Sequence, residues 1–312
     1  MSEFSSTLTI PDHFRRQYSA TWESVLQQKN AKFANAGYLE SSWTGKEYVF
    51  HDLDKIEAVE TTGLRFGDSN PSDLSGGVRK GYQRQFDVAA KRDIWDQKML
   101  NAWALPDSDV VREMKNSLNR ALDDIWLQSA VADSLGGPDP HVTAIALPNT
   151  SKVAVNYIPG GTGSNTGLTY NKLLEARKRL VQAEVDLDNE EIYLAISPEE
   201  VMQMVAYVAA APNDFWAKVL GAWLEQNVTG KPAKLMGFNV IETNRLTLAS
   251  TDIRTCVAFA KSAFRMSPIT QTLKMDTIPT KRYALWIQSF MSAGVVRVND
   301  AKVQVIYCDQ SP

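Results

Sequence analysis

The 312-residue sequence predicts an α+β protein built on one long helix, with extended strands along that helix and a separate α/β part. Residues 106–133 carry apolar side chains at helical spacing between clear start and stop signals. Residues 38–96 hold two extended stretches around a tip rich in glycine, serine and proline. Residues 168–261 alternate predicted helices and strands. A chain of this length is expected to fold as two or more substructures.

The helix expected at residues 106–133 is the element on which the others are laid. Asp107 and Ser108 give its start signal, because a side-chain oxygen at the N-cap satisfies a helix amide that has no intrahelical partner. The glycines and prolines of residues 136–140 give its stop signal. One face should be buried, and it is formed by Val110, Met114, Leu118, Leu122 and Ile125.

Before the hairpin, residues 1–37 form a polar segment with one amphipathic piece. Phe14, Tyr18 and Trp22 can share one face of a helix in this piece. The segment itself offers nothing against which to bury that face. We therefore expect it to pack as an arm on another part of the chain or on a neighbouring subunit, with these three aromatic residues in the contact.

The two legs of the expected hairpin carry opposite charge. Residues 40–60 hold six acidic and two basic residues, whereas residues 78–92 hold five basic and one acidic. One interpretation pairs the legs with each other, at most about 1 kcal/mol per pair. The other lays the basic leg over a neighbouring subunit, with Arg79, Lys80 and Arg84 in the contact. A long two-stranded ribbon is marginal alone, so it should lie on other elements.

The remaining elements follow from periodicity and capping. Residues 197–200, Ser-Pro-Glu-Glu, form a capping box with proline at the first helical position and predict a helix that runs to residue 211. Further helices are expected at 170–183 and 214–226, and strands at 191–196, 238–242 and 256–260. Residues 283–309 return to β alternation with a turn at Asn299 and Asp300, and the long helix is their expected partner layer.

The sequence offers no catalytic constellation, metal-ligand set or cofactor motif, so an enzyme is not expected. The three histidines lie in separate segments, and Cys256 and Cys308 lack CxxC spacing, which fits a reducing compartment. Residues 160–167 are rich in glycine but lack the lysine of a Walker loop and the spacing of GxGxxG. A crossing between substructures is the better interpretation of that loop. Asp123 and Asp124 are expected on a solvated helix face.

Charge and hydropathy limit the partners. A formal net charge of −3 gives no sign of a strongly basic nucleic-acid binder, so any contact with DNA would be local. Neither a signal peptide nor a membrane span is expected, because the most apolar run, residues 204–211, is ended by Pro212.

The order of these elements, together with several local strings, resembles the major capsid proteins of tailed bacteriophages, which have the Hong Kong 97 fold. The likeness covers nearly the whole chain. The strings are QYSATWESVLQQKNAKF, DSDVVREMKNSLNRALDDIWLQSA, TGLTYNKLLEARKRLVQAEVDLDNEEIYLAISPEEV, LMGFNVIETNRL and SAGVVRVNDAKVQVIYCD.

The resemblance implies a structural protein that self-assembles as hexamers and pentamers into an icosahedral head around double-stranded DNA, which it contacts non-specifically. The short segment before the hairpin leaves no room for a scaffolding domain, so a separate scaffolding protein is expected, together with a portal. The implied location is the virion capsid, assembled in the host bacterial cytoplasm, with no membrane partner. The implied parts are an N-terminal arm (1–37), an extended loop (38–96), a peripheral domain with a spine helix (97–160), an axial domain (161–261) and a return to the peripheral β-sheet (262–312).

Two other interpretations stay open at this point. A cellular encapsulating shell of the same fold would hold an enzyme cargo, and neighbouring genes for portal and terminase would argue against it. A soluble α/β enzyme would use residues 160–167 as a ligand loop, and a monomer with saturable nucleotide binding would favour it. Lys46, Lys55 and Lys80 lie in or near the extended loop, but no motif assigns a covalent cross-link to them.

Overall fold

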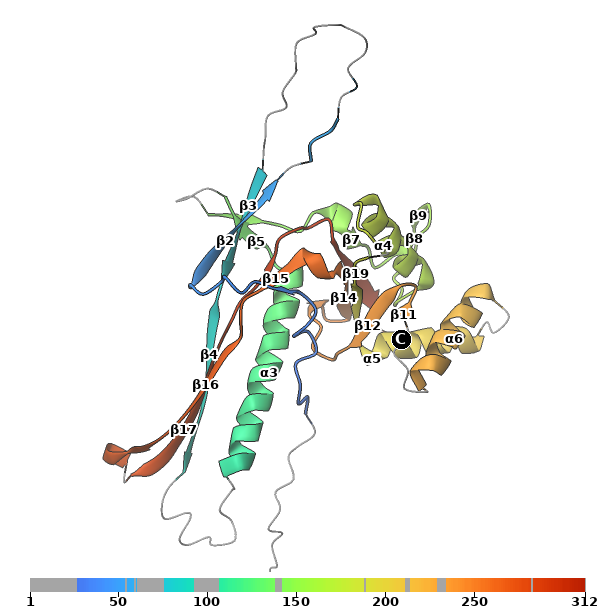
Figure 1. Ribbon diagram of the computed structural model, residues 1–312. Coiled ribbons are helices and arrows are strands. Elements are labelled where there is room, and N and C mark those ends of the chain that lie inside the picture. Colours follow the sequence, from blue (N-terminus) through green and yellow to red (C-terminus); the bar gives the residue numbers. More distant parts are fainter. Residues whose placement is uncertain are drawn as a thin grey trace, which may run out of the picture.

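A computed structural model of the chain describes residues 27–53, 55–58, 60, 76–92, 107–137, 142–187, 189–210, 214–228, 234–281 and 283–311. Phe14, Tyr18 and Trp22 of the expected arm contact lie outside these residues. The long helix α3 stands between a ribbon of strands and an α/β part (Figure 1). In the part of the chain that the structure describes, no helix is both long and apolar enough to cross a membrane.

The helix α3 runs over Asp107–Val131, close to the expected 106–133. Its predicted apolar face is confirmed at four of its five residues, because Met114, Leu118, Leu122 and Ile125 are at most 4% exposed, whereas Val110 in the first turn is only partly buried. Each large apolar side chain buried in this way stabilises the fold by about 1.5–3 kcal/mol. The helix is therefore a core element and not only a surface strut.

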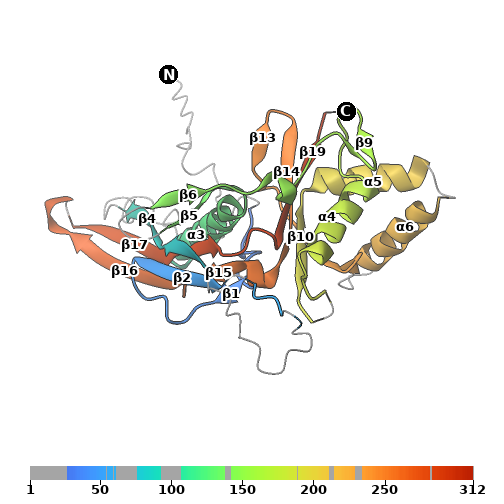
Figure 2. The same cartoon turned by 90° about the horizontal axis from the view of Figure 1, so that it is seen from above.

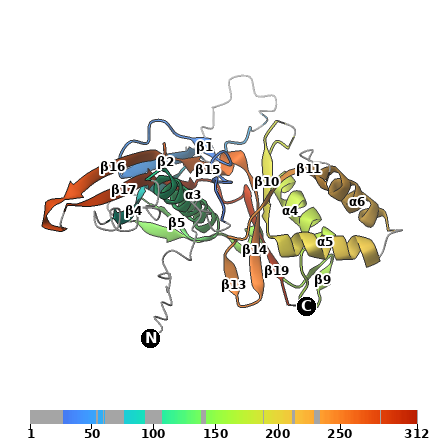
Figure 3. The ribbon, with the colours of Figure 1, turned by 90° about the horizontal axis from the view of Figure 1, so that it is seen from below.

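The ribbon beside α3 is an antiparallel sheet in the order β16-β17-β4. Its strands are β4 (Arg84–Arg92), β16 (Thr270–Ile278) and β17 (Ala284–Ala293). Phe86 and Val88 of β4 pack against the main hydrophobic core. Figure 3 shows this ribbon projecting away from the α/β part, and α3 packs on β4 and β17.

A second sheet, in the order β2-β3-β5-β6, forms the base of the extended loop. Its strands are β2 (Glu47–Leu53), β3 (Gly76–Tyr82), β5 (Ser134–Gly136) and β6 (Thr143–Ile145). The antiparallel pairing of β2 with β3 confirms the hairpin. The interpretation that pairs the whole basic leg with the acidic leg is wrong, because the chain changes partner at Gln83 and β4 pairs with β17. Burial of Phe86 and Val88 on the core outweighs weak exposed charge pairs.

Short elements complete the region around α3. They are the sheet strands β1 (Tyr38–Leu39), β15 (Phe264–Met266) and β18 (Val295–Arg297), in the order β1-β15-β18, and the 3-10 turns η1 (Asn149–Ser151), η2 (Lys261–Ala263) and η3 (Pro279–Lys281).

The α/β part is a mixed sheet in the order β11-β12-β10-β14-β19-β7, with β13 beside β14. Its strands are β7 (Lys152–Val153), β10 (Ile192–Ile196), β11 (Lys234–Leu235), β12 (Phe238–Glu242), β13 (Leu248–Ser250), β14 (Ile253–Ala260) and β19 (Val303–Asp309). Its helices are α4 (Tyr170–Gln182), α5 (Pro198–Ala210) and α6 (Phe215–Val228). The helices and strands expected between residues 168 and 261 are thus confirmed, with small shifts at their ends.

Within residues 262–312, β17 and β18 pack on α3, the expected partner layer, whereas the last strand does not join their sheets. The strands divide among three sheets, and β19 pairs with β14 and β7 in the α/β sheet. Val303, Gln304, Val305 and Ile306 are all buried, so both faces of β19 are covered. A strand buried on both faces belongs inside a sheet that has layers on both sides. Figure 2 shows these layers, with α3 on one side of the sheet and α4, α5 and α6 on the other.

One continuous core joins α3, the end of the arm and the α/β sheet. Trp126 of α3 lies at the meeting point. Its ring centroid is 4.6 Å from that of Phe33, 4.4 Å from Phe259 and 4.5 Å from Phe264. The elements on the two sides of α3 therefore share one core.

Candidate functional site

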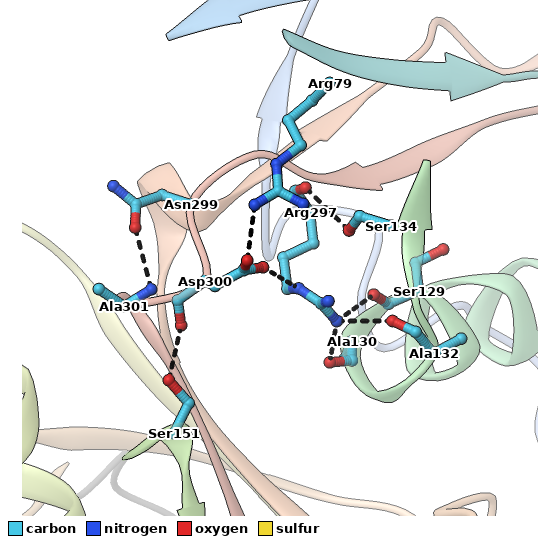
Figure 4. A network of polar contacts seen from close by, with 10 residues as sticks. All are labelled: Arg79, Ser129, Ala130, Ala132, Ser134, Ser151, Arg297, Asn299, Asp300 and Ala301. Carbon is cyan, nitrogen blue, oxygen red and sulfur yellow. Dashed lines mark hydrogen bonds and ion pairs between the residues drawn. The ribbon is translucent and has the colours of Figure 1, made fainter. Parts of the chain in front are cut away.

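A buried polar network fastens the base of the extended loop to the C-terminal end of α3 (Figure 4). Arg79 of β3 donates from Nη2 to Oδ2 of Asp300 at 2.6 Å. The two side chains are 14% and 13% exposed, so the ion pair is largely shielded from solvent. Shielding strengthens the attraction, but Nη1 of Arg79 and Nη2 of Arg297 are buried without a hydrogen-bond partner among the described residues, which offsets part of the gain.

Arg297, in the same network, caps the helix α3 from a distant segment. Its Nη1 donates to the carbonyl oxygens of Ala130 and Ala132 at 2.9 and 2.8 Å, and its Nε donates to Oδ1 of Asp300 at 2.6 Å. The last carbonyls of a helix lack intrahelical partners and carry partial negative charge. A buried guanidinium therefore satisfies both the helix end and one oxygen of Asp300.

The turn expected at Asn299 and Asp300 connects three elements. The carboxylate of Asp300 accepts from two arginines, and its backbone carbonyl accepts from Ser151 Oγ of η1 at 3.1 Å. Asn299 Oδ1 accepts from the Ala301 amide at 3.0 Å and tightens the turn. The sequence indicates this turn but not its role, because the two arginines come from segments far apart in the chain.

The other two basic residues predicted to contact a neighbour also have partners in their own chain. Lys80 is buried, and its Nζ lies 3.6 Å from Oε1 of Glu47 across the β2–β3 pair. Arg84 is exposed and donates from Nη1 to Oε1 of Gln128 at 2.7 Å. Arg79 and Lys80 thus support their own subunit, whereas Arg84 keeps its side chain at the surface.

The polar face of α3 holds the end of the arm, which corrects the expectation of a solvated face for Asp123, whereas the side chain of Asp124 is 36% exposed. Asp123 is fully buried, and its carboxylate accepts from the backbone amides of Lys32 at 3.0 Å and Phe33 at 3.1 Å. Asp124 accepts both donors of the Arg245 guanidinium fork. Buried carboxylates persist when backbone amides and cations satisfy them, and the adjacent arm and loop segments supply both here.

Residues 160–167 begin in the turn of the hairpin formed by β8 (Tyr157–Ile158) and β9 (Gly161–Thr162), include β9 and lead to α4. Lys172 of α4 reaches back to this loop, where Nζ donates to the carbonyl oxygens of Thr166 at 2.6 Å and Gly167 at 2.9 Å. A third bond, at 2.9 Å, goes to the carbonyl of Tyr307 in β19. Burial lowers the pKa of this ammonium group. The lysine ties the loop to β19, which supports its interpretation as a connection between substructures.

Cys256 and Cys308 lie on the neighbouring strands β14 and β19, and both are buried. Hydrogen bonding with Cys308 and burial raise the pKa of the Cys256 thiol well above its usual range, so the thiol stays protonated and unreactive. Across the described ranges, no group of three histidine, cysteine, aspartate or glutamate residues could hold a metal ion.

A cavity of about 940 Å³ opens between the N-terminal end of α4 and the pair α5–α6. The stacked rings of Tyr170 and Trp216, with centroids 3.7 Å apart, line it. Gln203 of α5 also lines it, accepting from the Leu168 amide at 2.9 Å and donating to the carbonyl of Asp309 at 3.0 Å. The cavity is therefore part of a fixed framework of three helices and the C-terminal segment.

A family model described as phage capsid protein matches residues 10–310. The chain belongs to the phage capsid protein family. Similar solved structures include the head of Helicobacter pylori bacteriophage KHP40, at 10% identity over 100% of both chains with a TM-score of 0.65. The capsid of Cyanophage Pam1 is similar at 12% identity over 99% of both chains with a TM-score of 0.65. Mycobacterium phage Che8 gives 16% identity over 96% of this chain and 97% of the other, with a TM-score of 0.63. No curated protein matches.

At these identities the structural likeness shows the fold, which is the Hong Kong 97-like capsid fold that the sequence resemblance implied. Family and fold together make this protein a structural subunit of the phage head, a major capsid protein. Such subunits assemble into a shell, so the surfaces of functional interest are those that meet other copies.

Proposed function

We propose that this capsid protein assembles as hexamers and pentamers into the icosahedral head of a tailed phage and encloses double-stranded DNA. The observation that carries the proposal is the contrast along the extended loop. Its base is fastened through Arg79 and Asp300, whereas Leu53 and Ile56 further out are exposed apolar side chains. Apolar side chains on a projecting segment favour contact with another chain.

In this assembly each part of the chain has a distinct role. The extended loop, residues 38–96, reaches over a neighbouring subunit, and residues 161–261 surround the local symmetry axis. The arm at residues 1–37 packs on another part of the chain or on a neighbouring subunit. The clamp of the arm by Asp123 and of the loop by Asp300 supports these roles, because both clamps set the direction in which a projecting segment leaves the subunit.

Among the residues predicted to touch a neighbour, Arg84 is the described side chain that suits the role, because it is exposed at the strand that leaves the loop. Arg79 and Lys80 form ion pairs within their own subunit and thereby position the loop. Phe14, Tyr18 and Trp22 remain proposed contacts of the arm.

The proposed partners are a separate scaffolding protein, a portal and the packaged DNA, with assembly in the host cytoplasm. The formal net charge of −3 supports DNA contacts that are local and non-specific, since a subunit without a large positive charge gains little from counterion release.

Expression of the protein with and without its scaffolding protein tests the proposal. Sedimentation velocity and electron microscopy should show capsomers or closed shells. A monomer at high concentration under both conditions would contradict it. A cellular shell around enzyme cargo is the second candidate, favoured only by the shared fold, and nuclease-protected DNA in shells from infected cells would separate the two.

A further inference from the structure

The three helices of the α/β part leave two apolar surfaces on different sides. On the outer face of α4, Leu174 and Val181 are 44% and 52% exposed. They are seven residues apart and therefore share one side of the helix. On the pair α5–α6, Met202 and Phe215 are 65% and 63% exposed; Met202 lines the 940 Å³ cavity, and Phe215 contacts Trp216, which also lines it. Exposed apolar groups gathered in this way mark surfaces that contact other molecules.

The charges on these two surfaces are complementary. Of the exposed charged side chains, the two on α4 are both basic, whereas α5 and α6 carry two acidic residues and one basic residue. The exposed cations of α4 are Arg177 and Lys178, and Glu199 is an exposed anion that lines the cavity. An apolar surface with a positive rim therefore has a counterpart with a negative rim on the same molecule.

The two surfaces also lie toward opposite ends of one sheet. The helix α4 packs on β19 and β7, which end the sheet on one side, whereas α6 packs on β11, which ends it on the other. Figure 1 shows α4 at the upper end of this sheet and α5–α6 at the lower end. Complementary patches at opposite ends of a subunit produce head-to-tail contacts, and such contacts close into rings when the rotation is suitable.

We propose that the outer face of α4 in one subunit docks on the α5–α6 side of the cavity mouth in the next copy of this chain. Leu174 and Val181 cover Met202 and Phe215, and Arg177 meets Glu199. The contact repeats around the ring that makes a capsomer. This inference rests on the proposed assembly into hexamers and pentamers and specifies which surfaces of the axial part meet.

Charge reversal tests the contact because the surfaces carry opposite signs. Arg177→Glu should reduce the yield of assembled capsomers at least tenfold, because it places like charges across every contact of the ring. The matched control is Lys218→Glu, which makes the same change of charge on α6 of the opposing surface and should leave assembly equal or improved. Adding Glu199→Lys to Arg177→Glu should restore assembly. Circular dichroism and thermal melting of each variant confirm that the subunit stays folded.

A disulfide ladder gives a second, independent measurement. Val181→Cys combined with Met202→Cys places one thiol on each surface, and both native cysteines are buried. Oxidation by copper–phenanthroline and dissolved oxygen should give a non-reducing ladder that passes dimers and ends at five or six chains. Monomers only, or dimers only, would overturn the head-to-tail contact.

The outcomes separate this inference from the proposed function. Parent protein that forms shells, together with an Arg177→Glu variant that also forms them normally, would overturn the α4 contact and leave the capsid assembly standing. Parent protein that never assembles would overturn the assembly itself.

Discussion

Two regions of the molecule use arginine in opposite ways. One is the junction, which is the polar network of Arg79, Arg297 and Asp300 at the end of α3. The other is the rim, which is the exposed surface of α4, α5 and α6. In the junction, Arg297 is buried, and its Nε and Nη1 atoms donate to Asp300 and to the carbonyls of a helix end. On the rim, Arg177 is exposed beside exposed leucine and valine. The first arrangement makes the charge part of the fold. The second leaves it available to another chain.

The difference in burial sets the size of the expected effects. Removing one partner of a buried ion pair costs about 3–5 kcal/mol, because the other charge stays desolvated. An exposed pair contributes about 0–1 kcal/mol. With a total stability of about 5–15 kcal/mol, changes in the junction should appear as unfolding. Changes on the rim should appear as lost association of folded subunits.

The largest effect is expected inside the core that both regions share. Leu122→Asp should prevent folding, since Leu122 is 2% exposed and the change both removes its packing and buries a carboxylate without a partner. The expected cost is more than about 5 kcal/mol, close to the whole stability. Solubility and thermal melting of the purified subunit measure it, and melting at the parent temperature would contradict the placement of this face in the core.

Arg297→Leu should break the junction at a cost of about 3–5 kcal/mol, because Asp300 and the helix carbonyls lose their shared donor. Chemical denaturation of the subunit measures this loss. Arg177→Leu is the matched control on the rim and should change the free energy of unfolding by less than about 1 kcal/mol. Equal losses in the two variants would remove the distinction between the regions. Arg297→Lys should be intermediate, since an ammonium group cannot reproduce the planar fork.

These two regions were predictable from the sequence to different degrees. Helical periodicity placed Leu122 in the core, and the capping box at residues 197–200 is confirmed in part: the Glu200 carboxylate accepts from the Ser197 amide at 2.8 Å. Local patterns of this kind depend on residues a few positions apart. The role of Arg297 depends on carbonyls about one-half of the chain away, and no local pattern encodes it.

The wrong assignments have the same origin. The alternation in residues 303–309 resembled a half-buried strand, whereas β19 is covered on both faces by layers that only the tertiary fold assembles. Asp123 looked like a surface acid because its partners are backbone amides of the arm, which carry no sequence signature. The positive charge of the basic leg, residues 78–92, could be predicted from the sequence, but the burial of Lys80 could not.

A smaller effect should separate the basic residues of the loop. Arg84→Glu should leave melting within about 1 kcal/mol of the parent, because it loses one exposed hydrogen bond, and should reduce shell assembly. The pair Arg79→Glu and Lys80→Glu should destabilise the subunit by more than about 3 kcal/mol, because Asp300 then faces a like charge largely shielded from solvent and a carboxylate is placed at the buried position 80. Sedimentation beside thermal melting distinguishes the outcomes. Normal shells from Arg84→Glu would remove Arg84 from the subunit contact.

The smallest effect is expected within α4. Glu175 and Arg179 of this helix bond to each other, whereas Arg177 of the same helix is exposed. Glu175 accepts from Arg179 Nε at 2.9 Å and from Tyr157 Oη at 2.9 Å, while Arg179 also donates to the carbonyl of Lys152 at 2.8 Å. Burial alone would raise the pKa of Glu175, but the hydrogen bonds from Arg179, Tyr157 and Lys178 lower it below its usual 4.5.

The folded state therefore favours the ionised carboxylate of Glu175. Because its folded pKa lies below the unfolded value, the stabilisation is complete above pH 4.5 and is lost as the pH falls through the lower folded value. Glu175→Gln should lower stability by about 1 kcal/mol at neutral pH, and the gap to the parent should close in acid. Glu225→Gln, an exposed change on α6, is the control and should show a smaller gap at neutral pH. A stability difference between Glu175→Gln and the parent that stays constant from neutral to acid pH would contradict a stabilising role of the ionised carboxylate. The contrast between a charge used in the fold, Glu175, and a charge left exposed, Arg177, would then not hold within α4.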